Sequence, residues 1–131
     1  MPLRDGSAED YPGASRRHYS NAIDLNDAGQ FDNAGHLIGF AAECAIKHAI
    51  QLRGEQSARV HLPDLAAAAR RSFNGGRRRA PIFNLLKGDV LKGWSVDQRY
   101  SPTGYITSTT VLSWIGESRR LMAAAGVRGG K

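Results

Sequence analysis

The chain is poor in the features that mark several classes of protein. It has one cysteine, Cys44, so an internal disulfide framework and a zinc site built from cysteines are both excluded. No apolar run approaches the roughly 18 residues that a membrane-spanning helix needs, so we expect no membrane insertion. The first 13 residues lack the apolar stretch of a secretory signal, and we therefore expect a cytoplasmic protein.

The composition is otherwise that of a globular domain, but its charge is uneven. The 131 residues are 41% hydrophobic and 23% charged, which suits one folded domain. The net charge of +6 is matched by the segment 70–92 alone, because residues 1–69 sum to −3 and residues 93–131 to +3. The cations of that segment are Arg70, Arg71, Arg77, Arg78, Arg79, Lys87 and Lys92. Such a cluster favours a polyanionic partner such as RNA, DNA or a nucleotide, and a solvated basic loop is the alternative reading.

Hydrophobic periodicity predicts helices along the whole chain. Apolar residues recur at three- and four-residue steps over 31–53, which becomes the long central second helix. Ser15 is the expected N-cap of the first helix. The other predicted helices cover 15–28, 62–73, 81–91 and 103–125. The predicted fold is therefore all-α, a five-helix bundle with an antiparallel up-down core and no strands.

The ends of the chain and two glycines complete this reading. We expect a flexible lead-in at 1–13, a helical domain over 14–125 and a disordered tail at 126–131. Gly35 and Gly39 stand four residues apart inside the second helix, where each costs about 1 kcal/mol relative to alanine. We expect the backbone of another helix to approach closely at this position.

The order of motifs resembles the HEPN domain family. The second helix carries Ala41-Ala42-Glu43 followed by Lys47, and the next helix opens with His61-Leu62-Pro63-Asp64-Leu65. An aromatic-flanked stretch, Trp94 to Tyr100, precedes the last helix. The resemblance covers residues 14–125 and implies a helical bundle with a polar cleft, usually a homodimer, common in prokaryotic toxin–antitoxin and defence systems. It also implies a cognate antitoxin-like protein as a possible partner.

The catalytic motif of that family is incomplete in this chain. Many HEPN proteins are ribonucleases with an arginine that is followed, after four to six intervening residues, by a histidine. Arg99 stands at the arginine position, but Gly104, Tyr105 and Ile106 occupy the positions of the histidine. Neither tyrosine nor arginine exchanges a proton readily near neutral pH. The resemblance therefore favours a non-catalytic binding module, and the alternative is a ribonuclease toxin that uses Arg99 with Tyr105 or with a residue of a second subunit.

The remaining candidate residues are expected to bind rather than to catalyse. Glu43 lies in an apolar stretch and needs a partner, which Lys47, Arg99 or Tyr100 can supply. It is either a buried anchor or part of a cleft, and Arg99 is either its partner or a phosphate ligand. The predicted binding residues are Arg99, Tyr100, Glu43, Lys47, Arg77, Arg78 and Arg79. The histidines and acids show no metal-ligand spacing, so neither a metal nor a cofactor is expected.

The incomplete motif yields a first testable prediction. The purified protein should cleave RNA no faster than a buffer control, because no histidine follows Arg99. A gel-based cleavage assay measures this. Robust cleavage that disappears in Arg99→Ala would contradict the prediction and support the ribonuclease alternative.

Overall fold

The computed structural model describes residues 9–52, 60–74 and 81–127, and every regular element in these ranges is a helix. The elements are α1 (Tyr11–Asp27), α2 (Phe31–Leu52), α3 (Asp64–Asn74), α4 (Pro81–Leu85), the 3-10 helix η1 (Val96–Tyr100) and α5 (Ser108–Ala124). The all-α class predicted from the periodicity is confirmed.

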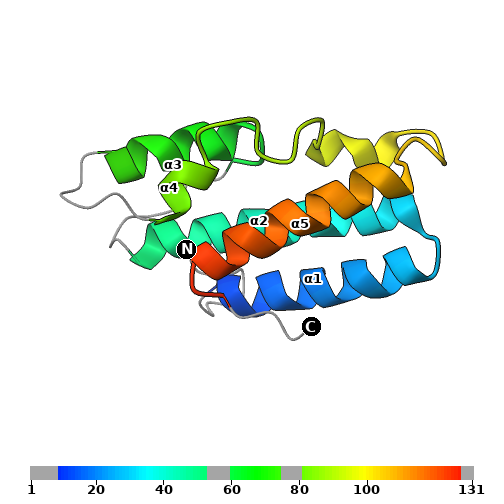
Figure 1. Cartoon of the computed structure of the whole chain (residues 1–131), viewed down its shortest axis with the longest axis horizontal. Helices are drawn as coiled ribbons and strands as arrows, with labels where there is room; N and C mark the ends of the chain where they lie inside the picture. Colours follow the sequence, from blue (N-terminus) through cyan, green and yellow to red (C-terminus); the bar gives the residue numbers. More distant parts are fainter. Residues whose placement is uncertain (1–8, 53–59, 75–80, 128–131) are drawn as a thin grey trace.

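Helix α2 contacts α1, α3, η1 and α5, whereas α4 contacts α3 and α5. Figure 1 shows α1 antiparallel to α2 on one side, and α3 with α4 on the other side. Helix α5 lies along α2 in the same direction, because α3, α4 and η1 return the chain to the start of α2. The tight turn between α1 and α2 passes through Gly29, whose φ of +78° favours glycine.

Small residues allow α1 and α5 to pack closely on α2. Alanines at 34, 41, 42 and 45 of α2 are fully buried. Ser15 of α1 donates its hydroxyl to the carbonyl of Ala41 at 2.7 Å, and Ser118 of α5 donates to that of Ile38 at 3.2 Å. Both serines are fully buried, and these bonds satisfy polar groups that would otherwise be costly inside the core.

Side chains, rather than the backbone of another helix, pack against the two glycines of α2. The prediction of a close helix–helix backbone approach at Gly35 and Gly39 is therefore wrong. A Cβ built on Gly39 would lie 1.9 Å from the indole of Trp94, in the loop before η1. A Cβ on Gly35 would lie 3.0 Å from the ring of Trp114 in α5. Each glycine thus leaves the space that one tryptophan ring occupies against α2.

Several predicted boundaries are wrong for identifiable reasons. Helix α1 begins at Tyr11, inside the predicted lead-in, because the carboxylate of Asp10 caps it by accepting from the Gly13 N–H at 3.0 Å. Ser15 is therefore not the cap. Helix α4 ends at Leu85 rather than near residue 91, since the chain turns repeatedly through 86–93. Helix α5 begins at Ser108 rather than near 103, capped by Thr107.

The predicted tail also begins too early. Val127 is 2% exposed, and its N–H donates to the carbonyl of Met122 at 2.8 Å. Gly126, with φ of +80°, provides the left-handed residue that closes this helix end. Residues 128–131 lie outside the described ranges, as do residues 1–8 of the predicted lead-in.

The packing of Trp94 on α2 yields a second prediction. Gly39→Ala should lower the free energy of unfolding by about 1–3 kcal/mol, because overpacking outweighs the gain in helix propensity. Gly88→Ala is the control, since a Cβ there meets nothing within 4 Å, and it should change stability by less than about 0.5 kcal/mol. Urea unfolding followed by circular dichroism measures both. Equal stability of the two variants would show that Trp94 is not seated on Gly39.

Candidate functional site

A groove opens between the beginning of α3 and the turns that follow α4. Its volume is about 710 Å³. Pro63, Ala66 and Arg70 line one wall, and residues 87–95 line the other. The groove is thus built largely from the basic segment 70–92, together with residues that lie on either side of it.

Three cations line this groove with a single acid. They are Arg70, Lys87 and Lys92, and the acid is Asp89. The guanidinium of Arg70 donates to the carbonyl of Leu86 at 2.5 Å, which links the two walls and fixes the position of that charge. One such bond uses one of the five N–H donors of an arginine. The arrangement therefore presents a net positive charge with one cation already oriented.

A repeated triplet explains why both lysines reach the surface. The sequence reads Leu86-Lys87-Gly88 and, after two residues, Leu91-Lys92-Gly93. Both leucines are fully buried or nearly so, whereas both lysines are exposed. Leu91 has φ of +48°, a left-handed conformation that costs a residue with a side chain about 1–2 kcal/mol. Burial of its side chain offsets that cost, and the adjacent Lys92 is held at the groove.

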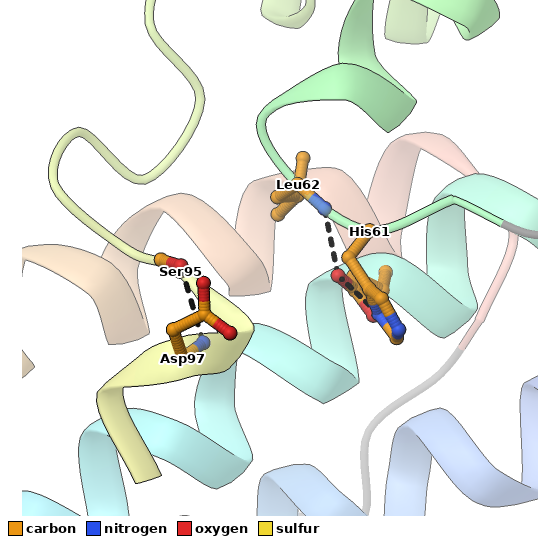
Figure 2. A network of polar contacts seen from close by, with 5 residues as sticks. His61, Leu62, Ser95 and Asp97 are labelled. Atoms are coloured by element: carbon orange, nitrogen blue, oxygen red, sulfur yellow. Dashed lines mark hydrogen bonds and ion pairs between the residues drawn. The ribbon is translucent and has the colours of Figure 1, made fainter. Parts of the chain in front are cut away.

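A buried carboxylate on α2 holds the start of the α3 wall. Glu43 is 3% exposed and accepts from the backbone N–H of Leu62 at 2.7 Å. Its other oxygen pairs with Nδ1 of His61 at 3.0 Å. Figure 2 shows His61 and Leu62 in the segment that leads into α3, with dashed lines from both to this carboxylate. We call this set the Glu43 clasp, formed by Glu43, His61 and Leu62.

Aromatic rings fill the space beside the clasp. The ring of Phe40 lies 6.2 Å from that of His61 and 5.6 Å from that of Trp94, measured between centroids. His36 stacks on Trp94 at 5.8 Å. The indole N–H of Trp94 donates to the carbonyl of Gly35 at 3.0 Å, which ties the second wall to α2.

The pKa values of two side chains, one in α1 and one in α2, are shifted in the direction that favours the uncharged form. Burial, with a smaller contribution from Arg17, lowers the pKa of His18. Burial raises the pKa of the Cys44 thiol to about 11, so the thiolate that a cysteine nucleophile requires is scarce at neutral pH. Neither side chain lines the groove, so the positive charge of the groove comes from arginine and lysine.

The predicted site residues whose side chains the structure describes do not meet at the groove. Glu43 lies in the clasp, where its ion pair is with His61, whereas the ammonium of Lys47 lies 5.9 Å from the centre of the Tyr11 ring. Tyr100 and Tyr105 are 78% and 62% exposed, and neither lines the groove. The side chain of Arg99, and all of Arg77, Arg78 and Arg79, fall outside the described residues, so their roles stay predictions.

Sequence reasoning missed two parts of the site. The charge pattern identifies Arg70, Lys87 and Lys92 only as members of a basic segment, although the repeated Leu-Lys-Gly triplet is a signal that marks the two lysines. The sequence marks His61 only as the first residue of the motif that opens the predicted third helix. Its spacing from Glu43 gives no hint of the pair, because the two residues are 18 positions apart and belong to different elements.

Comparison with known proteins gives no relative for this chain. No protein-family model, no curated protein and no solved structure matches it. The described helices include none that is both long enough and apolar enough to cross a membrane. Within the same ranges, no group of histidine, cysteine and acidic side chains is arranged to hold a metal ion.

The clasp yields a third prediction, on stability. Glu43→Leu should lower the free energy of unfolding by about 1–3 kcal/mol, because it leaves the Leu62 N–H without its acceptor, whereas the half-exposed His61 can be hydrated. In a double-mutant cycle with His61→Ala, the coupling energy should exceed about 0.5 kcal/mol. Denaturant unfolding of the four proteins measures it. Additive effects would mean that the two side chains do not interact in solution.

Proposed function

We propose that this chain is a non-catalytic helical module that binds single-stranded nucleic acid by its phosphate backbone. The observation that carries the proposal is the convergence of Arg70, Lys87 and Lys92 on one groove. Phosphate groups are bound by such cations, which release counterions from the nucleic acid on binding. The orientation of Arg70 by the Leu86 carbonyl supports this role, since less side-chain freedom is then lost on binding.

The shape of the site favours a single strand over a duplex. Duplex DNA is read by a helix or ribbon that projects into its grooves. A single strand instead follows a positively charged groove in the protein. A concave site of about 710 Å³ between α3 and the turns after α4 suits the second kind of ligand.

The lining favours contact with phosphates over contact with bases. Trp94, the one aromatic residue among those that line the groove in the described structure, is only 3% exposed. Its ring is seated on α2 and offers no open face on which a base stacks. Binding is therefore expected to depend on charge more than on base identity.

The biological setting that we propose follows from the HEPN resemblance. The two motifs that carry the resemblance are in contact, since Glu43 of the α2 motif binds His61 and Leu62 of the motif that opens α3. This contact and the all-α fold support a HEPN-like module. The resemblance adds the proposal that it acts as a homodimer, and the sequence adds a cytoplasmic location. In that setting the chain belongs to a toxin–antitoxin or defence system, with an antitoxin-like protein as a further partner.

A salt titration tests the proposed function. With three phosphate contacts, a plot of log association constant against log salt concentration should have a slope of about −2 or steeper for a labelled oligothymidylate. The double variant Lys87→Ala, Lys92→Ala should weaken binding and reduce that slope by about 1.4. Fluorescence anisotropy over a range of salt concentrations measures both quantities.

The control removes the same charge from another face of the molecule. Arg16 and Arg17 are exposed on α1, which packs against a different side of α2 from α3. The double variant Arg16→Ala, Arg17→Ala should keep the wild-type slope. Equal losses in the two double variants would indicate a general effect of net charge and would contradict a site in the groove.

A further inference from the structure

Both walls of the groove are attached to one face of α2. The α3 wall starts at Pro63, directly after Leu62, whose N–H is held by Glu43 at 2.7 Å. The other wall ends near Trp94, whose indole is held by Gly35 and seated on Gly39. Positions 35, 39 and 43 are four residues apart and therefore lie on the same face of the helix.

The two attachments are also in contact with each other through Phe40. Its ring meets His61 of the clasp and Trp94 of the opposite wall. The bond from Arg70 to the Leu86 carbonyl holds the far end of the α3 wall. The core contacts of α3 are made by small or apolar side chains such as Leu65, Ala66 and Ala69. Such contacts are not directional, whereas the bond from Leu62 to Glu43 defines one position for the start of the wall.

We propose that Glu43 is the positioning residue of the nucleic-acid groove. By fixing His61 and Leu62 on α2, it sets the start of the α3 backbone from which Arg70 reaches the Leu86 carbonyl, so that the two bonds together hold Arg70 beside Lys87 and Lys92 and all three cations engage one strand. Glu43 touches no ligand in this arrangement, because it is 3% exposed and does not line the groove. The inference rests on the proposed function and assigns to the clasp a role beyond stability.

The chain contains a matched carboxylate for the control. Asp32, also on α2, accepts from the backbone N–H groups of Gly104 at 2.7 Å and Ile106 at 3.0 Å. These bonds lower the pKa of Asp32. Like Glu43, Asp32 ties a downstream segment to α2 by backbone donors, but it lies near the start of the helix and does not line the groove.

The experiment compares binding by Glu43→Leu, Glu43→Gln, His61→Ala and Asp32→Leu. The probe is a labelled oligothymidylate of about 15 nucleotides, titrated at several salt concentrations. Unfolding curves first establish conditions in which every variant is folded. We expect Glu43→Leu to weaken binding about tenfold and to reduce the salt slope by about 0.7, the contribution of one phosphate contact. Glu43→Gln retains an acceptor for the Leu62 N–H and should restore most of the affinity.

Asp32→Leu should bind with the wild-type affinity and salt slope, because its loop is remote from the groove. If Glu43→Leu does not fold, His61→Ala replaces it, since His61 is half exposed and its loss leaves the Leu62 bond in place. That variant should weaken binding by a smaller factor while Asp32→Leu does not.

Two results overturn the inference in distinguishable ways. A folded wild-type protein that does not bind the oligonucleotide overturns the proposed function, and the positioning role with it. Wild-type binding that the clasp variants leave unchanged, or weaken no more than Asp32→Leu does, overturns the positioning role alone.

Discussion

Hydrogen bonds from backbone N–H groups to two carboxylates of α2 are the interaction on which the arrangement of the chain after α2 depends. Glu43 receives the Leu62 N–H, and Asp32 receives those of Gly104 and Ile106. Hydrogen bonds to a charged acceptor are shorter and stronger than neutral ones. Each carboxylate therefore determines where an irregular segment starts its next helix, α3 in one case and α5 in the other.

The groove follows from these attachments together with the packing of one tryptophan. Gly39 leaves the space in which Trp94 sits, and Glu43 holds the segment before α3 one helical turn further along. Between these two points the chain places a short repeated turn that buries leucines and exposes lysines. The cluster of cations is thus positioned by the core rather than by loops alone, which gives it a defined arrangement rather than that of a diffuse positive surface.

The sequence predicts the helices far better than the site. Periodicity suffices for α2, because its apolar residues recur with a helical period. Periodicity does not locate a helix start that a capping side chain determines, as Asp10 does for α1 and Thr107 does for α5. The site depends on contacts between distant positions, such as Glu43 with His61, which no local pattern encodes. The charge distribution along the sequence identifies the basic segment. Only the fold shows that Arg70 lies across the groove from the two lysines.

Amide hydrogen exchange at Leu62 tests the central claim most directly, namely that the Glu43 carboxylate fixes an irregular segment on α2. Leu62 precedes α3, so its N–H has no partner within a helix and owes its protection to Glu43. The account predicts slow exchange at Leu62, comparable with amides inside α2, measured by NMR in the wild-type protein. Exchange at the rate of an unstructured peptide would show that this bond is not formed in solution and would contradict the account.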